Sequence, residues 1–361
     1  MTHSTFVFNE GPIYDGKMSR LSGNNLQNEE TILTGLPRSI RDHLSNSIVF
    51  DPNNPNVLYF NQGSNSAGGA PDGSWGFRPE RLLTAATLRL NLNLLPNNLP
   101  LNVRTSDNVG VINAASTTSL TMSDGTYNPY ANNAPLTIFA SGLRNPYDLV
   151  WHSNGQLYVP TNGTAGGSNS PASAQGTRRP DGSFYNGPTI PAVNGNSAQD
   201  DFLFRIDPNS SIGYYGHPNP LRGEYVLNSG AATSTTYPNG VVADANYRGF
   251  AFNFELNKSP NGVIEYKFPG ALQGALIVCR YSGGSDLITL IPDGPNGDIG
   301  TSLVGLTGFS GLDDPLDLVE DTNTGNIYVS DFATSEIILL RLDNSGETSN
   351  SGLSILSLIH I

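Results

Sequence analysis

Several residue types that define common protein classes are scarce in this sequence. A single cysteine, Cys279, excludes an intrachain disulfide framework and any cysteine-based zinc site. Charged residues make up only 14% of the chain, and 18 Lys and Arg against 31 Asp and Glu give a formal net charge of −13. Because no basic stripe is present to displace phosphate counterions, neither nucleic acid nor an anionic membrane is an expected partner.

Long hydrophobic runs are also missing. No apolar stretch reaches the length that crosses a bilayer, so no membrane span is expected. Met1 is followed by the polar residues THSTF, which do not form a signal peptide. The low lysine content, together with abundant Asn and Thr, nevertheless favours a protein exported to the periplasm or the extracellular space.

Turn-forming residues are abundant instead. The chain has 361 residues, of which 40 are Gly and 25 are Pro, and its polar residues are mostly Asn, Ser and Thr. Long helices are built from Ala, Glu, Lys and Leu, whereas this composition is typical of many short strands joined by turns. The sequence therefore predicts an all-β protein.

Four segments share one pattern: an apolar stretch, a turn, then a short apolar strand that ends in Gly or another small residue. They are SIVFDPNNPNVLYFNQG (47–63), DLVWHSNGQLYVPTNG (148–163), YKFPGALQGALIVCRYSGG (266–284) and DLVEDTNTGNIYVSDFA (317–333). Their spacing fits a repeat of roughly 50 residues, doubled by insertions in two places, which is typical of a four-stranded propeller blade.

Further strands follow where each blade needs them. Third strands are predicted at 86–93, 201–207, 286–292 and 336–342, and fourth strands at 136–143 and 302–309. Residues 5–35 supply only the last three strands of a blade, and residues 315–342 only the first three. This count gives about five blades, two of them incomplete, and predicts a propeller over 1–345 that is truncated at its N-terminus. The tail 346–361 matches no blade and is expected to be unstructured or extraneous.

Polar residues lie next to the predicted inner strands, at positions that face the axial funnel of a propeller. His43 precedes one inner strand beside Asp42, and a histidine next to a carboxylate can act as a general base. Arg144 and Asn145 occupy the equivalent place in the following blade. The other members of this set are Asn162 and Gly163, at the end of a second strand, and Asp200 and Asp201, before a third strand.

At these residues the sequence resembles the PQQ-dependent glucose/sorbosone dehydrogenases. The resemblance is carried by RDHLSNSIVF, GLRNPYDLVWHSNGQLYVPTNG, DDFLFRIDPNSSIGYYGHPNP, SPNGVIEYKFPGALQGALIVCRYSGG and GFSGLDDPLDLVEDTNTGNIYVSDF. It spans roughly residues 5–343 and is most specific in a D-H-x-S motif followed about 100 residues later by G-x-R-N-P. The resemblance implies a six-bladed-type β-propeller that oxidises an aldose at C1 to its lactone.

The resemblance also implies roles for individual residues. His43 matches the base that takes the proton of the sugar C1 hydroxyl while hydride passes to the quinone, and Asp42 would orient it. Arg144, placed with them in the catalytic set, and Asn145 match residues that contact the quinone oxygens. The YYGHP stretch (214–218) takes the place of the family's N-Y-G-W-P turn.

A calcium ion and the cofactor's carboxylates have their own implied ligands. Gly163 and Thr164 fall where backbone carbonyls hold a Ca²⁺ that acts as a Lewis acid and anchors the cofactor, with Asn162 beside them. Arg280 is the basic residue that remains to bind PQQ in the later blades. An external electron acceptor would reoxidise the cofactor.

Acidic residues in the last predicted blade keep two other functions open. The segment GLDDPLDLVED (311–321) would place Asp313 and Asp314 near a tricarboxylate cofactor, which is electrostatically unfavourable. A non-enzymatic secreted propeller with a carbohydrate-binding funnel is therefore the alternative. A metal-dependent, lactonase-like hydrolase would need a carboxylate cage, of which Asp200 and Asp201 are the only hint.

Overall fold

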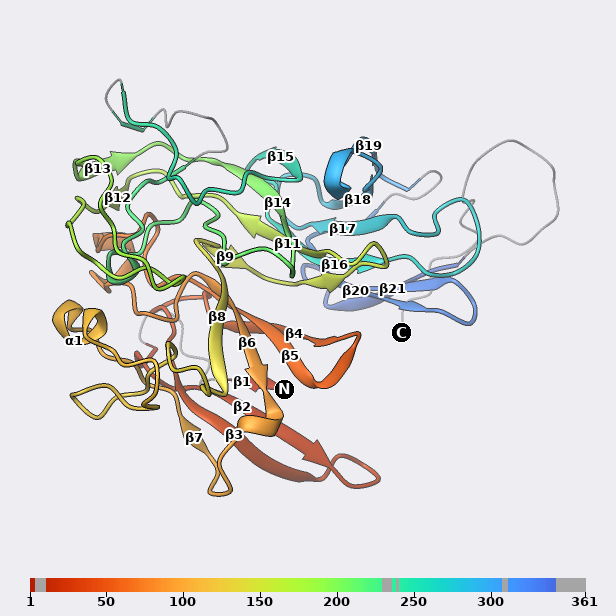
Figure 1. Ribbon diagram of the computed structural model, residues 1–361. Helices are drawn as coiled ribbons and strands as arrows, with labels where there is room; N and C mark the ends of the chain where they lie inside the picture. Colours follow the sequence, from red (N-terminus) through yellow and green to blue (C-terminus); the bar gives the residue numbers. More distant parts are fainter. Residues whose placement is uncertain (4–10, 229–235, 238–239, 307–310, 342–361) are drawn as a thin grey trace. The chain divides into compact units, whose positions relative to one another are not determined.

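The computed structural model describes residues 1–3, 11–228, 236–237, 240–306 and 311–341, and this part of the chain is almost entirely β structure (Figure 1). Its helical elements are short: α1 (Val109–Asn113), η1 (Gly73–Trp75), η2 (Leu92–Leu94), η3 (Pro220–Arg222) and η4 (Pro295–Gly297). The prediction of an all-β chain is confirmed. None of the helices in the described part of the chain combines the length and the apolar character needed to span a membrane.

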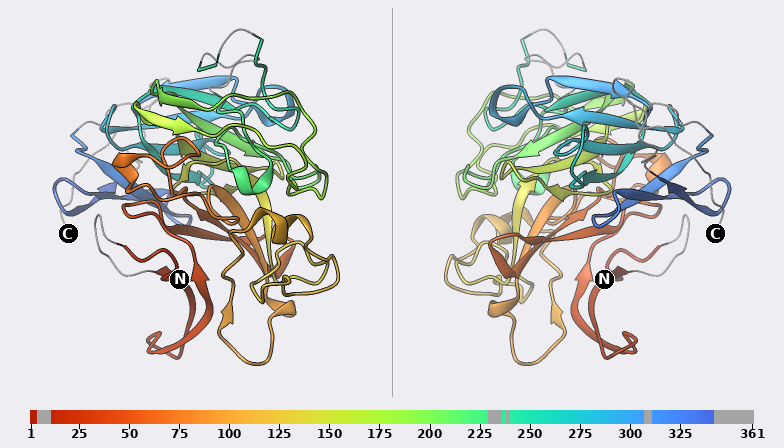
Figure 2. Two further views of the ribbon diagram at one scale, coloured as in Figure 1. Left: turned by 90° about the vertical axis from the view of Figure 1, so that its left-hand side faces the viewer. Right: turned by 90° about the vertical axis from the view of Figure 1, so that its right-hand side faces the viewer.

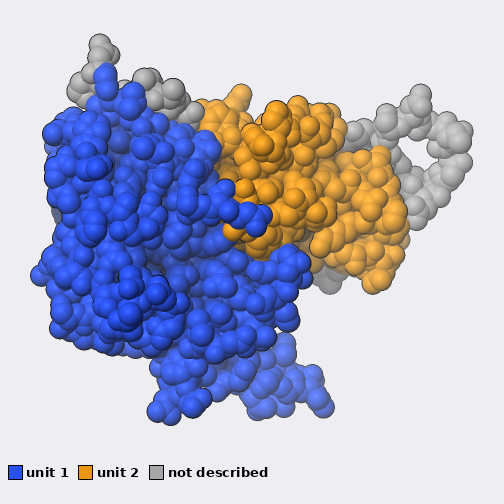
Figure 3. All heavy atoms as spheres, in the orientation of Figure 1, with its two compact units in different colours: residues 1–146, 163–199, 209–249 blue, residues 147–162, 200–208, 250–361 orange. Residues whose placement is uncertain are grey.

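The chain divides into two compact units (Figure 3). The first unit comprises residues 1–146, 163–199 and 209–249, and the second comprises residues 147–162, 200–208 and 250–361. The prediction that 1–345 forms a single propeller domain stays a prediction.

The first sheet of the first unit has the strand order β1-β2-β3-β7. Its strands are β1 (Thr2–His3), β2 (Gly16–Ser22), β3 (Asn28–Leu36) and β7 (Leu101–Asn102). The strands β2 and β3 form a long curved hairpin (Figure 2), and β7 joins β3 in parallel. Of the three strands predicted in 5–35, the segment STFVFNE lies outside the described residues.

The second sheet of the first unit is an antiparallel blade with the order β4-β5-β6-β8. Its strands are β4 (Ser45–Asp51), β5 (Asn54–Gln62), β6 (Ala86–Asn91) and β8 (Leu136–Ser141), as the sequence predicts. In β8, Leu136, Ile138 and Ala140 are buried while the residues between them are half-buried, which is the period of two expected for a strand packed on one face. This face and the first sheet share one hydrophobic core.

Three short strands complete the first unit. The strand β9 (Asn145–Pro146) follows β8, and β12 (Ser168–Ser170) pairs with β13 (Val193–Asn196) as a separate antiparallel hairpin.

The second unit contains three antiparallel sheets (Figure 1). One has the order β10-β11-β14-β15, from β10 (Val150–Trp151), β11 (Leu157–Asn162), β14 (Asp200–Ile206) and β15 (Phe252–Leu256). The next is β16 (Pro260–Glu265), β17 (Leu276–Arg280), β18 (Asp286–Ile291) and β19 (Thr301–Val304), and the last is β20 (Pro315–Asp321), β21 (Asn326–Asp331) and β22 (Glu336–Leu340). The predicted third strands of this unit are therefore confirmed, and the three-stranded sheet at 315–340 matches the incomplete blade expected there.

The described residues thus form five propeller-type blades, of which the last has three strands and each of the others has at least four. The expectation of six blades, which came from the family resemblance, is wrong for this part of the chain, because the remaining described strands, β12 and β13, form only a two-stranded hairpin. The number of about five blades, obtained by counting predicted strands, is confirmed. The predicted N-terminal truncation stays a prediction, and the tail 346–361 lies outside the described residues.

Candidate functional site

His43 is held in a tight backbone turn just before β4. Its backbone N–H donates to the Ser39 hydroxyl at 3.1 Å, and its carbonyl accepts from the Ser39 N–H at 3.0 Å. The facing residue is Gly63, where an added Cβ would lie 2.7 Å from the His43 Cβ. Because glycine has no Cβ, the backbone at residue 63 can pack this closely against His43. The His43 side chain is 2% exposed.

Hydrogen bonds to Ser64 define the tautomer of the His43 ring. The ring Nδ1 lies 2.9 Å from the Ser64 Oγ and 3.2 Å from the Ser64 carbonyl oxygen. The Ser64 hydroxyl donates to the Ser66 carbonyl at 2.7 Å, and a carbonyl oxygen can only accept. Nδ1 must therefore carry the proton, and the neutral ring keeps an unprotonated Nε2, which has no hydrogen-bond partner among the described residues.

The surroundings of His43 favour its neutral form. Burial lowers the pKa of His43 well below the usual 6.5, and the positive charge of Arg144 lowers it further. A neutral imidazole with a free Nε2 lone pair is the state that can accept a proton from a hydroxyl group.

Trp75 forms an aromatic wall beside this histidine. Its ring centroid is 4.2 Å from that of His43, and the guanidinium carbons of Arg144 and Arg41 lie 5.6 Å and 5.7 Å from the indole centroid. The side chain of Asp72 caps η1 by accepting from the Trp75 N–H at 3.1 Å, which fixes the backbone that carries the indole. Two cations and one neutral histidine therefore surround a single indole ring, an arrangement that cation–π attraction favours.

Residues 64–67, called here the 64–67 loop, connect His43 with Arg144. The Ser64 N–H donates to the Arg144 carbonyl at 2.8 Å, and the Arg144 Nε donates to the Ala67 carbonyl at 3.0 Å. Since Ser64 also holds the His43 ring, one short loop positions His43 and Arg144, two of the three predicted catalytic residues. We refer to His43, Ser64, Trp75, Arg144 and Arg41 as the His43 cluster.

Glu80 packs against the 64–67 loop and is 2% exposed. Its carboxylate accepts from the backbone N–H groups of Asn65 at 3.0 Å and Ser66 at 2.9 Å, and from the Ser66 hydroxyl at 2.5 Å. The Thr84 hydroxyl and His217 Nε2, the latter at 3.1 Å, also donate to it. Burial raises the pKa of Glu80, but hydrogen bonds from His217, Ser66 and Thr84 outweigh this effect and lower the pKa below its usual value.

His217 is a second buried, neutral histidine in the same unit. Because Glu80 can only accept, His217 Nε2 carries the proton, and its Nδ1 is buried without a partner among the described residues. Burial lowers the pKa of His217, although the Glu80 carboxylate acts in the opposite direction. A protonated His217 would bury an unpaired N–H donor, so the geometry and the pKa both indicate the neutral form.

The other predicted site residues of the first unit differ in their exposure and in their hydrogen-bond partners. Asp42, expected to orient His43, is exposed, and the His43 ring bonds to Ser64. Asn145 is 9% exposed, and its amide oxygen is buried without a partner in the described part of the chain. Gly163 and Thr164 follow β11, and the Thr164 carbonyl, predicted to bind Ca²⁺, accepts from the Gln199 N–H at 2.9 Å.

Asn162 and Arg280 belong to the second unit. The Asn162 amide donates to the Ser259 hydroxyl at 3.0 Å, while its Oδ1 is buried and has no described partner. The Arg280 guanidinium forms two hydrogen bonds to Asp286, Nε to Oδ1 at 2.7 Å and Nη2 to Oδ2 at 2.5 Å. Its charge is therefore compensated within its own sheet, which leaves less of it for a cofactor carboxylate.

The two acidic residues of the hydrolase alternative accept hydrogen bonds from neighbouring segments. Asp201 accepts from the backbone N–H groups of Lys258 and Ser259 at 2.7 Å and 2.8 Å, and Asp200 accepts from the Asn253 amide at 2.9 Å. Among the described residues there is no group of three or more His, Cys, Asp or Glu side chains that could hold a metal ion. The carboxylate cage that a hydrolase of this kind would need is not formed by these residues.

Sequence reasoning missed five residues of this region: Arg41, Ser64, Trp75, Glu80 and His217. Weak signals for some of them are present. Trp75 is one of only two tryptophans, and Glu80 is a charged residue at the start of the apolar stretch RLLTAATLRL, where a buried charge needs partners. His217 lies in the YYGHP turn, which the family resemblance marks but which gives no reason to place it beside Glu80.

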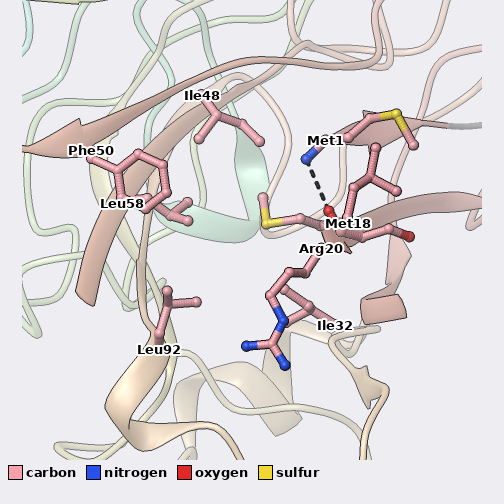
Figure 4. Close-up of a pocket in the computed structure, with 10 residues that line it drawn as sticks. Met1, Met18, Arg20, Ile32, Ile48, Phe50, Leu58 and Leu92 are labelled. Carbon is pink, nitrogen blue, oxygen red and sulfur yellow. Dashed lines mark hydrogen bonds between the residues drawn. The ribbon is translucent and has the colours of Figure 1, made fainter. Parts of the chain in front are cut away.

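Two cavities of the first unit share no lining residue with the His43 cluster. One, of about 350 Å³, is mainly apolar and is lined by Met18, Ile32, Ile48, Phe50 and other side chains (Figure 4). At its edge the Met1 amino group donates to the Ser19 carbonyl at 2.9 Å. The other, of about 370 Å³, has a more polar lining that includes Tyr130, Asn132, Arg178 and Asp181.

Comparison with known proteins connects this fold to solved dehydrogenases. No family model and no curated protein matches the sequence. The structure is similar to the PQQ domain of pyranose dehydrogenase from Coprinopsis cinerea, with a TM-score of 0.53 and 14% identity over 90% of this chain and 76% of that one.

Two other solved structures are similar to a comparable degree. A Trichoderma reesei protein of Carbohydrate-Active Enzymes Family AA12 gives a TM-score of 0.52 at 16% identity, over 91% of this chain and 76% of that one. An oxidoreductase of Thermus thermophilus described as a glucose dehydrogenase gives 0.51 at 17% identity, over 91% and 71%. The chain therefore has the fold of these proteins, and the resemblance found in the sequence is confirmed at the level of the fold.

Proposed function

We propose that this chain oxidises an aldose sugar at C1 to the lactone, with PQQ as the hydride acceptor and His43 as the general base. The observation that carries the proposal is the state of His43: its Nδ1 donates to Ser64, its Nε2 is unprotonated, and Arg144 lies beside the same indole ring. Similar folds in solved structures of a PQQ domain and a glucose dehydrogenase support the choice of reaction and cofactor.

The residues of the first unit fit a flat, anionic quinone cofactor. Arg41 and Arg144 place two cations beside the Trp75 ring, and the Arg41 Nε is buried without a partner among the described residues. Guanidinium groups bind carboxylates and carbonyl oxygens well, and indole rings stack on flat ligands. Arg144 and Asn145 would hold the quinone, which when bound supplies a two-electron acceptor for the hydride from C1. A Ca²⁺ bound by the Gly163 and Thr164 carbonyls remains part of the proposal.

The proton of the reaction goes to this chain. As the C–H bond at C1 gives up its hydrogen with two electrons, the C1 hydroxyl loses its proton to the His43 Nε2, and the C1–O bond becomes the lactone carbonyl. The neutral ring accepts this proton without changing its bond to Ser64, because Nδ1 is a donor in both states. Arg144 and the buried surroundings lower the basicity of His43, so the proton is readily released after the reaction.

The test uses the full chain with PQQ and Ca²⁺. Calorimetric titration measures cofactor binding, and reduction of an artificial electron-accepting dye in the presence of glucose or another aldose measures turnover. We expect dye reduction that requires PQQ and is lost in His43→Gln, while PQQ binding is retained. Failure of PQQ to bind, or equal turnover in His43→Gln, would contradict the proposal.

One observation favours the alternative of a sugar-binding protein without enzymatic activity. Arg280, the basic residue expected to bind the cofactor in the later blades, is paired with Asp286. If sugars bind to the full chain but PQQ does not, the binding function is the better description. Both proposals place the protein in the periplasm or outside the cell, because its low lysine content and abundant Asn and Thr favour an exported protein. The dehydrogenase would also need an external electron acceptor there.

A further inference from the structure

The buried Glu80 carboxylate binds the 64–67 loop, which in turn holds His43 and Arg144. The 64–67 loop makes contacts in two directions. Towards the His43 cluster, Ser64 accepts from the His43 ring and the Ala67 carbonyl accepts from Arg144. Away from the cluster, the N–H groups of Asn65 and Ser66 both point at the Glu80 carboxylate.

We propose that Glu80 is a positioning residue: through the 64–67 loop, its buried carboxylate sets the orientation of His43 and Arg144 and keeps His43 in the tautomer with a free Nε2. This inference rests on the proposed function only for its effect on turnover. The effect on the tautomer of His43 follows from the geometry alone.

The two carboxylate oxygens of Glu80 have different partners. Oε2 accepts from the Asn65 N–H and the Thr84 hydroxyl, whereas Oε1 accepts from the Ser66 N–H, the Ser66 hydroxyl and His217. Every one of these partners acts as a donor. A side chain in this place must accept on both sides, which only a carboxylate can do.

A glutamine at position 80 has nearly the same shape but cannot satisfy this arrangement. In either orientation of its amide, the NH₂ group faces a backbone N–H, that of Asn65 or that of Ser66. Two buried donors then point at each other, and the loop must move to relieve the contact. Because Ser64 and Ala67 lie at the two ends of this loop, its movement changes the hydrogen bonds of both His43 and Arg144.

Glu224 provides a matched control in the same unit. It is also buried, at 1% exposed, and its carboxylate accepts from the Arg222 Nε at 2.9 Å and from the Ser141 hydroxyl. None of these contacts involves the 64–67 loop. Glu224→Gln therefore removes a buried charge of the same kind without acting on His43.

The experiment measures the tautomer of His43 in the full chain labelled with ¹⁵N-histidine. Long-range ¹H–¹⁵N spectra distinguish a protonated Nδ1 from a protonated Nε2, and the His43→Gln variant assigns the signal among the five histidines. We expect the Nδ1–H form in the wild type and in Glu224→Gln, and a mixture of tautomers in Glu80→Gln. An unchanged His43 signal in folded Glu80→Gln would overturn the inference.

A milder pair of variants covers the case in which Glu80→Gln does not fold. Ser66→Ala removes one donor to Glu80 and keeps the charge, and Ser141→Ala removes the corresponding donor to Glu224. The His43 signal should shift in Ser66→Ala and stay unchanged in Ser141→Ala. Equal signals in the two variants would count against a positioning role.

Turnover gives a second readout. A displaced base and arginine should lower kcat for aldose oxidation by about 10²-fold in Glu80→Gln, as expected for a misplacement near 1 Å. Glu224→Gln should retain its kcat under conditions where it is folded. If the wild type does not oxidise sugars, the proposed function fails, but the comparison of tautomers still decides whether Glu80 positions His43.

Discussion

Replacing His43 by glutamine should change how the stability of the protein depends on pH. In the folded chain, burial and the charge of Arg144 lower the pKa of His43 well below the value of 6.5 that an exposed histidine has. At a pH between these two values, the unfolded chain binds a proton at this position and the folded chain does not. Acid therefore favours the unfolded state.

The sign and size of this effect follow from proton linkage. Above pH 6.5 both states are unprotonated at His43, and the stability associated with its neutral form is fully present. As the pH falls below 6.5 this stability is lost by up to about 1.4 kcal/mol per pH unit, and the loss continues until the folded pKa is reached. Glutamine does not titrate and can still donate to Ser64, so the variant lacks this slope.

Urea unfolding of both proteins at a series of pH values between about 5 and 8 would measure the difference. The free energy of unfolding of the wild type minus that of His43→Gln should be constant above pH 6.5 and should fall with acid below it. Other titrating groups, such as Glu224, are common to both proteins and cancel. His217→Gln should give a slope of the same sign, because burial also lowers the pKa of His217.

A flat difference across the whole range would refute the reasoning, since it would mean that His43 has the same pKa in both states. A difference that grows as the pH falls would show that the folded protein holds His43 in its charged form. In that case the assignment of a free Nε2, on which the proposed reaction depends, would also fail.

Three other predictions concern residues around the site and in the second unit. Gly63→Ala should destabilise the protein by about 1–3 kcal/mol in urea unfolding, because its Cβ would lie 2.7 Å from the His43 Cβ. Gly73→Ala, where the nearest atom is 3.5 Å away, should lower the free energy of unfolding by less. An equal loss of stability in the two variants would contradict this account. Burial raises the pKa of the Cys279 thiol, so thiol reagents should modify it only in the unfolded protein, and rapid labelling of the native chain would disagree. Arg280→Ala should lower the free energy of unfolding by about 1–3 kcal/mol, because its two hydrogen bonds to Asp286 are lost. Its affinity for PQQ should be nearly unchanged. Calorimetry would compare this affinity with that of Asp286→Asn, which breaks the same pair.

Local sequence patterns were sufficient for most of the strands. The alternation of apolar and polar residues and the turns rich in Gly, Pro and Asn located β6, β8, β14, β18 and β20–β22. This works because side chains in a strand alternate between its two faces, so burial on one face leaves a period of two in the sequence. By contrast, β7 was not predicted: it contains only two residues and exists because it pairs with β3.

The sequence by itself also predicted, from their motifs, His43, Arg144 and Asn145 as candidate site residues. Only the tertiary structure decided how they are held. It gave Ser64 in place of Asp42 as the partner of the His43 ring, and it brought Trp75, Glu80 and His217 to the same region. The contacts responsible join residues 21, 77 and 137 positions apart. A hydrogen bond or a buried charge depends on which atoms meet in three dimensions, and residues so far apart leave no local pattern in the chain from which such a meeting can be read.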